Sequence, residues 1–578
     1  MKKVVQSVFV VTVALLALSG CKSRELNTQF SNTTGWNYYD EKTTNFEAKE
    51  GVGNVDPVGM VAIQGGTFAI GQTDEFITAP RDNSRRSITV SSFYMDKYEI
   101  SNLNWREYLH WMEMVFGYAA PKLVQAAMPD TLVWRDELAY NEPYVENYFR
   151  HPSFSFYPVV GISWDQAMQY CQWRTDRVNE LALVHAGAIE FPDFQQLRAL
   201  DETELEDWRN ANPGYEPVEV EITNGEDVNV EYHVPYEWIR DKFVFNTEKY
   251  LRRADYNPVN PDANRRSKKF HDAWNNPRKV DRTDGILVVG YRLPTEAEWE
   301  FAAFAPVAGT DGLTIEGKVY PWSGYHPRDL SKENMGMMQA NFVRGKGDMM
   351  GVSGMLNDGY VITNPVDAFA PNDFGLYNMA GNVNEWVMDV YRETTYQDAT
   401  EYNSFRGNIY SRAKKDDQGK YVINALGGID VEWTSEDDKR DYLDGDFASL
   451  IQTDYPLDTL GALFLKGLAA NTEGNGGGEE EEETEEEEGE EEEESEEEGG
   501  GESAAAANKK IDPTDIYAPK ITKTTHVYKG GSWNDRVYWL HPSSRRYLEG
   551  NKSKSTIGFR CAMSTLGDQI PSGPTQGM

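Results

Sequence analysis

The side chains in this chain with the greatest chemical reactivity are its cysteines and histidines, and their spacing excludes several common sites. The 578 residues contain only three cysteines and eight histidines. The histidines show no HExxH pattern and no clustered spacing, and the chain has no GxSxG nucleophile motif and no Walker-type phosphate loop. The sequence therefore does not predict a zinc protease, a serine hydrolase or a P-loop nucleotidase. Surface or packed roles are expected for the histidines, among them His110, His151, His185, His271 and His541.

The first cysteine, Cys21, indicates a lipid anchor. The pair Lys2-Lys3 precedes an apolar run over residues 8–18, and Leu18-Ser19-Gly20-Cys21 resembles a bacterial lipobox. The run is too short for a membrane-spanning helix. We expect residues 1–20 to be a lipoprotein signal peptide and Cys21 to carry the lipid. The following Lys22-Ser23 lacks the Asp that retains many lipoproteins at the inner membrane, which favours the outer membrane and its periplasmic face.

The charge balance argues against nucleic acid as a partner. There are 94 acidic and 56 basic residues, and the formal net charge is −38. Much of the acidity is local, because residues 479–498 include 17 glutamates. We find no basic stripe that could release the counterions of a polyanion. Hydrophobic residues make up 39% of the chain and aromatic residues 12%, which is enough for a sizeable core.

Cap signals and alternating patterns locate the elements that must position any site. Ser163-Trp-Asp-Gln166 and Thr295-Glu-Ala-Glu298 fit capping boxes, so helices are expected to begin at both places. A third helix is expected after Ser101. Short strands are predicted around the glycine turn within residues 61–71 and again over residues 91–98.

Changes in composition divide the chain into a core with two insertions. Residues 174–290 are polar, contain three Asn-Pro pairs, and are predicted to be a loop-rich insertion rather than a second core. The glutamate-rich run is too charged to fold and is expected to be a solvated spacer, with a role in binding cations or a basic partner as the alternative. The predicted segments are a tether (21–55), a first core segment (56–173), the first insertion (174–290), a second core segment (291–392), a second insertion (393–470), a disordered poly-Glu segment (471–508), a third core segment (509–565) and a tail (566–578).

Seven blocks in collinear order resemble the formylglycine-generating-enzyme (FGE), or sulfatase-modifying factor, family. They cover residues 60–173, 291–392 and 525–565, so the two insertions interrupt the resemblance. The resemblance implies an α+β, FGE-like fold that has little regular secondary structure and is distantly similar to C-type lectins. The blocks are Gly65-Gly-Thr-Phe-Ala-Ile-Gly71, Tyr94-Met-Asp-Lys-Tyr-Glu-Ile-Ser-Asn102, Pro158-Val-Val-Gly-Ile-Ser-Trp164, Tyr291-Arg-Leu-Pro-Thr-Glu-Ala-Glu-Trp-Glu300, Asp373-Phe-Gly-Leu-Tyr-Asn-Met-Ala-Gly-Asn-Val-Asn-Glu-Trp386, Lys529-Gly-Gly-Ser-Trp533 and Gly558-Phe-Arg560.

A finer resemblance is to the FGE-like lipoproteins of the Bacteroidetes gliding-motility and type IX secretion machinery. It rests on blocks such as Trp173-Arg-Thr-Asp-Arg-Val-Asn-Glu180, Asn341-Phe-Val-Arg-Gly-Lys-Gly-Asp348 and Thr33-Thr-Gly-Trp36. The poly-Glu segment departs from this pattern. The resemblance implies a structural role in a periplasmic assembly, with a GldK-type lipoprotein and a GldN-type ring protein as partners.

Family members that oxidise cysteine to formylglycine bind copper through two thiolates, and this chain lacks both. The matching positions, counted from Gly530-Gly531-Ser532, hold Asp535 and Leu540. Neither side chain supplies the soft sulfur ligand that Cu(I) prefers. The resemblance therefore implies a pseudoenzyme without copper and without catalytic residues.

The family domain can also bind Ca²⁺, and oxygen ligands remain at the matching positions. One site would use the side chains of Asn341 and Asp358 with the carbonyls of Phe342 and Tyr360. A second would use the side chains of Asn378 and Glu385 with the carbonyls of Gly381 and Val383. Such mixed oxygen ligands suit calcium. Each site offers one carboxylate, so water would have to complete the coordination. Turn or packing roles for Asp358 and Glu385 remain the alternative.

The resemblance further implies a disulfide between Cys171 and Cys561. Cys171 falls on the apolar face of the helix that begins at Ser163. The alternate residues Ile557, Phe559, Cys561 and Met563 are expected to share one apolar strand face. Family members place a bridge between the matching helix and strand, and an extracytoplasmic compartment permits it. Two separately buried thiols are the alternative.

Two other functions remain open from the sequence. One is an FGE-derived, metal-dependent oxidase with replaced ligands, which would contain metal after purification. The other is a Ca²⁺-dependent glycan-binding module, which the distant likeness to C-type lectins suggests. A structural component of the secretion or gliding machinery is the function that the resemblance favours.

Overall fold

The computed structural model describes residues 33–36, 57–72, 83, 85–136, 139–224, 227–259, 270, 278–306, 318–343, 358–391, 411–433 and 524–566. Cys21, the predicted signal peptide, the poly-Glu segment and most of the second insertion lie outside these residues. Contacts within the chain divide it into two units, the smaller formed by residues 1–53, 182–190 and 258–287. All site residues discussed below belong to the larger unit.

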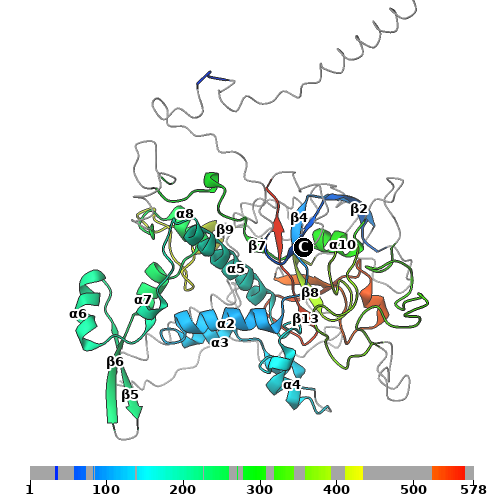
Figure 1. Cartoon of the computed structure of the whole chain (residues 1–578), viewed down its shortest axis with the longest axis horizontal. Coiled ribbons are helices and arrows are strands. Elements are labelled where there is room, and N and C mark those ends of the chain that lie inside the picture. The colour runs from blue at the N-terminus through cyan, green and yellow to red at the C-terminus, as the bar shows by residue number, and fades with distance from the viewer. Residues whose placement is uncertain are drawn as a thin grey trace, which may run out of the picture. The chain divides into compact units, whose positions relative to one another are not determined.

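Two four-stranded sheets form the frame of the larger unit (Figure 1). The first has the order β1-β4-β14-β7, and the second has the order β12-β11-β8-β13. The strands are β1 (Met60–Ile63), β4 (Phe93–Asp96), β7 (Tyr291–Arg292), β8 (Asn384–Val390), β11 (Thr525–Lys529), β12 (Arg546–Glu549), β13 (Ile557–Gly558) and β14 (Ala562–Ser564). All seven residues of β8 are buried, because strands flank it on both edges and helices cover it. The sheets therefore join regions of the sequence that are far apart.

Within the described residues, three hairpins add to this frame. They are β2 (Gly66–Ile70) with β3 (Arg86–Val90), β5 (Val218–Asn224) with β6 (Asp227–His233), and β9 (Ser411–Ala413) with β10 (Val431–Trp433). The glycine turn predicted between the first two strands is present, but β1 and β2 pair in different sheets. Gly65 explains the tight turn, since a Cβ atom there would lie 2.2 Å from the carbonyl oxygen of Val90.

The three helices predicted from cap signals begin where expected. α2 (Asn102–Phe116) is capped by Ser101, and α10 (Glu296–Phe304) is capped by the Thr295–Glu298 capping box. α5 (Trp164–His185) follows Ser163, whose hydroxyl accepts from the amide of Gln166 while the Gln166 side chain accepts from the amide of Ser163. These reciprocal bonds satisfy the free amides of the first helical turn.

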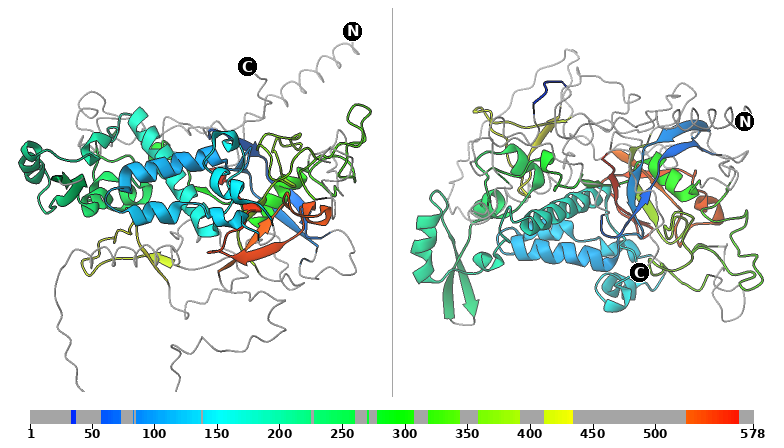
Figure 2. Two further views of the ribbon diagram at one scale, coloured as in Figure 1. Left: turned by 90° about the horizontal axis from the view of Figure 1, so that it is seen from below. Right: turned by 45° about the horizontal axis from the view of Figure 1, so that its top comes forward.

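Two hydrophobic clusters make up most of the core. The first joins α2, α3 (Pro121–Ala127) and α5 to the second sheet, with Trp105 stacked on Tyr170 at 5.3 Å between ring centroids. α2 and α3 lie side by side in both views of Figure 2. The second cluster joins α10 to β2, β3 and β8 around Trp299, which is fully buried. These clusters fix the two sheets and α10, which carry some of the site residues, among them Glu385 on β8.

The first insertion differs from the loop-rich segment predicted by its composition. α5 continues through residue 185, and the segment also holds α6 (Glu202–Ala211), α7 (Tyr236–Trp238), the π-helix η4 (Ile239–Phe243) and α8 (Thr247–Arg252). Tyr236, Trp238 and Val244 belong to the same hydrophobic cluster as Trp105. The described residues therefore contain more helix than a loop-rich insertion would, and they extend the existing core rather than form a second one. The short helices show no helical period in the sequence.

The described residues of the second insertion, 411–433, pack against the first. The hydroxyl of Tyr236 donates to the carbonyl of Ala425, and Lys420 forms an ion pair with Asp255 at 2.8 Å. A Cβ atom at Gly427 would lie 2.9 Å from the carbonyl oxygen of Arg240. The two insertions thus form one additional layer of packing.

Several short helices connect the larger elements. They are η1 (Thr131–Trp134), α4 (Glu142–Asn147), η2 (Pro152–Phe154), η3 (Phe194–Leu197), η6 (Arg282–Asp284) and η10 (Val537–Leu540). Among the described residues, no helix has both the length and the apolar character needed to cross a membrane.

Candidate functional site

The position that the resemblance matches to the copper thiolates holds a partly buried ion pair and a buried apolar side chain. The two oxygens of Asp535 accept hydrogen bonds from Arg546 at 2.6 and 2.7 Å. Ser532 and Asn384 also donate to Asp535, at 2.5 and 3.1 Å. Leu540 is fully buried and packs in an apolar cluster. The charges at this position are therefore satisfied by the protein itself.

The electrostatics keep Asp535 ionised. Burial raises the pKa of Asp535, but the hydrogen bonds and the positive charge of Arg546 outweigh burial, and the net pKa is lower than usual. The guanidinium of Arg546 also lies 4.5 Å from the ring centroid of Trp539 and 5.0 Å from that of Tyr528. An anionic carboxylate already bonded to Arg546 is a poor substitute for a copper thiolate.

The residues predicted for the first calcium site come together in the structure. The Asp358 carboxylate accepts hydrogen bonds from the amides of Phe342 (3.2 Å) and Tyr360 (3.0 Å), so three of the four residues meet at this side chain. Asn341 donates its Nδ2 to the carbonyl of Ile362 at 2.8 Å and to the side chain of Asn364 at 2.9 Å. Because both bonds use the nitrogen, the Asn341 side-chain oxygen is turned away from these acceptors.

The second predicted set lies on a loop with unusual backbone angles, except for Glu385, which lies in β8. Asn378, Gly381 and Asn382 all have positive φ, at 52°, 81° and 60°. Such angles strain non-glycine residues and often occur at functional loops. A Cβ atom at Gly381 would lie 2.4 Å from the carbonyl oxygen of Asn341, so this loop lies directly against the first set. The remaining two residues of the set, Val383 and Glu385, are fully buried.

A group of charged residues around Glu385 was not found by sequence reasoning. Both oxygens of Glu385 bond to Arg560, at 2.6 and 2.7 Å, and one also accepts from the indole of Trp299 at 2.8 Å. Glu99 lies close to this pair and accepts from the side chain of Asn382 at 2.6 Å. We call Glu99, Glu385 and Arg560 the open charge cluster. Burial raises the pKa of Glu99 well above its usual value and the charge of Glu385 raises it further, against the opposing effect of Arg560.

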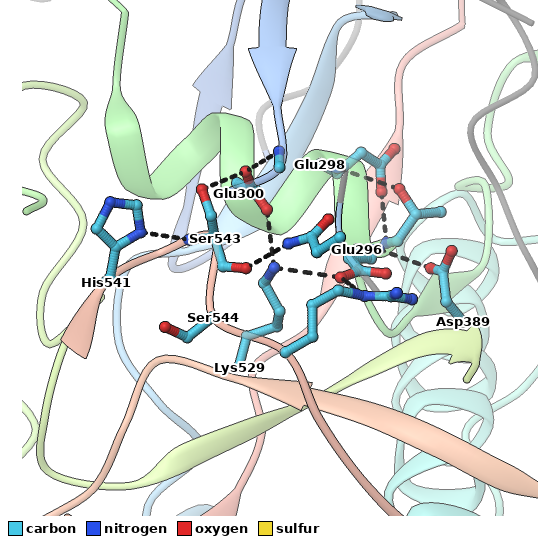
Figure 3. Close-up of polar contacts among 12 residues, drawn as sticks. Glu296, Glu298, Glu300, Asp389, Lys529, His541, Ser543 and Ser544 are labelled. Carbon is cyan, nitrogen blue, oxygen red and sulfur yellow. Dashed lines mark hydrogen bonds and ion pairs between the residues drawn. The ribbon is translucent and has the colours of Figure 1, made fainter. Parts of the chain in front are cut away.

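A second buried charge group lies beneath α10 (Figure 3). Lys529 contacts Glu296 at 3.2 Å and Glu300 at 2.8 Å, and Arg545 contacts Glu296 at 2.6 Å. The remaining oxygen of Glu300 accepts from the Ser543 hydroxyl and the amide of Gly71, both at 2.9 Å. We call Glu296, Glu300, Lys529 and Arg545 the closed charge cluster.

The pKa of Glu296 shows how far this second cluster is compensated. Burial raises the pKa of Glu296, but Arg545 and Lys529 outweigh burial and lower the pKa to about 2. Two carboxylates thus face two cations. This arrangement fastens α10 to the second sheet and leaves no charge for a ligand to satisfy.

The two core cysteines lie in contact. Their sulfur atoms are 3.5 Å apart, and both side chains are buried. The structure therefore brings together the pair that the resemblance implies, at a thiol–thiol distance, and the bond itself stays a prediction. Ile557, Phe559, Cys561 and Met563 are all buried as expected. They do not share one continuous strand, because β13 and β14 belong to different sheets.

No cluster of typical metal-binding side chains is found in the portion of the chain that the structure describes. There, no three His, Cys, Asp or Glu residues gather in a way that could hold a metal ion. A cation held by the two predicted sets would need amide and carbonyl oxygens as well as carboxylates. Asn341 and Asn378 could each supply a side-chain oxygen to such a cation. The Nδ2 atom of each donates two hydrogen bonds within the protein, so each Oδ1 atom points away from those acceptors.

The comparison with known families agrees with this architecture. The model of the sulfatase-modifying factor enzyme 1-like domain matches residues 47–565, which is most of the chain and includes both insertions. The chain belongs to this family. Its α+β fold with little regular secondary structure is the fold of that family, as the resemblance implied.

Similar proteins include both active and inactive relatives. The formylglycine-generating enzyme of Mus musculus is 32% identical over 155 residues, which are 27% of this chain and 35% of that protein. The enzyme of Thermomonospora curvata is 40% identical over 120 residues, 21% of this chain and 32% of that protein. The inactive C-alpha-formylglycine-generating enzyme 2 of Bos taurus is 34% identical over 140 residues, 23% and 38% of the two chains. The matches thus span about a third of the length of these relatives.

Among solved structures, PvdO from Pseudomonas aeruginosa aligns over 88% of this chain and 94% of its own. Its sequence identity is 14% and its TM-score is 0.36.

Proposed function

We propose that this protein is a catalytically inactive FGE-like lipoprotein with a structural role. The observation that carries the proposal is the replacement of the copper thiolates. Asp535 is bonded to Arg546, and Leu540 is buried among apolar residues. Neither position can supply sulfur to copper, so the step that activates oxygen in active family members has no ligand pair here. The similarity to a relative that is named as inactive adds support.

The finer half of the proposal concerns location and partners. The lipobox-like sequence at Cys21 favours an outer-membrane lipoprotein facing the periplasm, and the sequence blocks are most like those of GldJ. On this proposal the protein is a component of the type IX secretion or gliding machinery. Its partners would be a GldK-type lipoprotein and a GldN-type periplasmic ring protein.

Calcium would serve this role as a structural cation. Asn341, Asp358 and the carbonyls of Phe342 and Tyr360 would hold one ion. Asn378, Glu385 and the carbonyls of Gly381 and Val383 would hold the other. A bound Ca²⁺ would cross-link loops that otherwise have little regular structure. No reaction step depends on it.

An aldehyde assay tests whether the chain is catalytically inactive. The purified mature chain is incubated with Cu(I), oxygen and a sulfatase-type cysteine peptide, beside an active formylglycine-generating enzyme as a positive control. We expect no aldehyde above a boiled sample. Aldehyde formation by this chain would contradict the proposal directly.

Affinity isolation from the native outer membrane tests the structural role. The tagged wild-type protein should recover the lipoprotein and ring protein of the secretion machinery. The Cys21→Ala variant should leave the membrane fraction, because the acyl chains provide most of the membrane affinity. Wash-resistant membrane association of this variant would refute the lipid anchor. Recovery of the wild-type protein without any secretion component would refute the assignment to that machinery.

A further inference from the structure

The hairpin of β5 and β6 has unusually long strands for a sheet of only two. Each strand spans seven residues, and the register between them is continuous from Val218 with His233 to Asn224 with Asp227. Among the other strands of the described residues, each strand at a sheet edge has five residues or fewer. The hairpin extends away from the two four-stranded sheets (Figure 1). It has two edges, and each presents backbone groups that need hydrogen-bond partners.

The two edges of this hairpin differ. On β6, the carbonyl of Tyr232 accepts a hydrogen bond from the amide of Leu200 at 2.7 Å, and these two residues form an isolated antiparallel bridge. Tyr232 therefore directs its backbone groups away from β5. Its register partner Glu219 directs its own amide and carbonyl away from β6, because the two residues of such a pair face opposite edges. The edge of β6 is thus partly covered, and the opposite edge is formed by β5.

The alternation of an antiparallel ladder extends this result along β5. The amides and carbonyls of Glu219, Glu221 and Thr223 face the outer edge, and those of the residues between them face β6. In the described part of the chain, no other backbone group bonds to this outer edge. β5 also lacks the proline, lysine and bulge with which proteins commonly block pairing at an edge. The outer edge of β5 is therefore able to accept a third strand.

The charge of the hairpin indicates what kind of strand would fit. Residues 215–233 contain six acidic residues and no lysine or arginine. Glu219 is exposed and alternates along β5 with Val218, which is 40% exposed, and with Val220. Side chains that lie opposite each other on adjacent strands interact, and like charges there are unfavourable. A strand that alternates basic with apolar residues would therefore complement β5, whereas the β5 of a second copy would bring like charges together.

We propose that the outer edge of β5 binds an extended segment of a partner protein in which basic and apolar residues alternate. The segment would continue the sheet as a third strand, with backbone hydrogen bonds to Glu219, Glu221 and Thr223. Its basic residues would lie beside Glu219, and its apolar residues beside Val218 and Val220. Strand addition of this kind takes its affinity from the main chain and its specificity from alternate side chains. The inference goes beyond the proposed function and depends neither on the lipid anchor nor on the inactive site.

A synthetic peptide tests this edge directly. The probe is a labelled seven-residue peptide that alternates lysine and valine, and its binding to the full mature chain is followed by fluorescence anisotropy at physiological salt. We expect saturable binding. A second peptide of the same sequence has all its backbone amides methylated, so it keeps the charge and loses the donors that pair with a strand edge. We expect it to bind at least about tenfold more weakly.

The methylated peptide also controls for attraction to other acidic parts of the chain, such as residues 479–498. Equal binding of the two peptides would reduce the interaction to charge and overturn the proposal. A lack of binding by the unmethylated peptide would overturn it as well. Both results are obtained with the wild-type chain, so they do not depend on the folding of a variant.

Two proline variants locate the bound edge. Thr223→Pro removes an amide at the outer edge of β5, and Val228→Pro removes the amide of its register partner at the opposite edge of the hairpin. Neither substitution changes the charge or removes a hydrogen bond between β5 and β6. We expect peptide binding to weaken about fivefold or more in Thr223→Pro and to change by less than about twofold in Val228→Pro. A loss in Val228→Pro alone, or equal losses in both, would overturn the assignment to β5.

Sedimentation velocity distinguishes a partner protein from a second copy of this chain. We expect neither substitution to change the oligomeric state in the absence of peptide. A wild-type dimer that dissociates in Thr223→Pro and persists in Val228→Pro would assign the edge to a second copy and overturn the proposed partner.

Discussion

Two buried charge clusters in this protein use the same residue types and differ in one respect. In the closed charge cluster, Glu296 and Glu300 face Lys529 and Arg545, and the hydrogen bonds of Glu300 are completed by Ser543 and Gly71. In the open charge cluster, two carboxylates face the single cation Arg560, and among the described residues one oxygen of Glu99 is left without a partner. The residues of both clusters are buried, but only the closed charge cluster has as many cations as carboxylates.

The difference in charge balance distinguishes a cluster that only stabilises the fold from one that could bind an ion. A cluster whose charges cancel holds elements together, and a further ion would disturb it. A cluster with an uncompensated charge is stable only with a ligand or a proton to balance it. The position that the resemblance matches to the copper thiolates is similar to the closed charge cluster, because Asp535 and Arg546 form an ion pair. The proposal that catalysis is absent rests on this ion pair, and cation binding at the neighbouring loops remains part of the same proposal.

The largest expected effect concerns the segment between β13 and β14, which carries Arg560 and Cys561. We predict a disulfide between Cys171 and Cys561 in the mature protein. Such a bridge, which closes a loop of 390 residues, would stabilise the chain by roughly 6 kcal/mol in the chain-entropy model, less any native strain. Thiol titration of the denatured, unreduced protein should find neither core cysteine free, and reduction should lower the free energy of unfolding. Two titratable core thiols before reduction would contradict the bridge.

Breaking the closed charge cluster should have the next largest effect. Lys529→Met leaves Glu296 and Glu300 with one cation between them, and we expect a loss of about 3–5 kcal/mol in the free energy of unfolding. Chemical denaturation measures it. The control is Lys552→Met, whose side chain is 61% exposed and forms a surface pair with Glu549. That variant should change stability by less than about 0.5 kcal/mol. Equal effects of the two substitutions would refute the structural role of the closed charge cluster.

A third buried charge, Lys249, extends the comparison to an isolated cation. Its Nζ donates to the carbonyls of Arg240 at 3.0 Å and Val244 at 2.6 Å, next to the end of the π-helix. Burial lowers the pKa of Lys249 from 10.5 to about 7, although Asp241 and Asp176 oppose the shift. The folded pKa is below the unfolded value, so the unfolded chain binds more protons between these pH values. Lys249 should therefore make stability rise with pH in that window, by up to about 1.4 kcal/mol per unit.

The Lys249→Met variant isolates this contribution. Its free energy of unfolding, measured from pH 7 to pH 10, should rise less steeply than that of the wild type. The difference between the two slopes removes the effect of other groups that titrate in the same range. Parallel slopes would show that Lys249 keeps its usual pKa.

The sequence predicted correctly those helices that begin with a capping motif. The capping boxes at Ser163 and Thr295 depend on side chains three residues apart, and both are present. The helices of the first insertion were missed, since α7, η4 and α8 are too short for a periodic pattern. Their burial depends on contacts with α2 and α5, which local sequence does not show.

The candidate site was predicted only as far as the family resemblance reached. Asn341, Asp358, Asn378 and Glu385 were found because they match positions of the family's sites. Glu99 also lies in a motif block, but its importance comes from Asn378 and Asn382, which are 279 and 283 residues away in the sequence. The pairing of Glu385 with Arg560 spans 175 residues. Charge compensation of this kind becomes visible only when the sheets bring these segments together.

The metal content of the mature protein purified from its native membrane is the most direct test of the central claim. That claim is that this member of the family has lost the copper site and retained oxygen-ligand cation sites. Elemental analysis by mass spectrometry, after dialysis without chelator, should find calcium and only traces of copper. Stoichiometric copper in the protein would contradict the account.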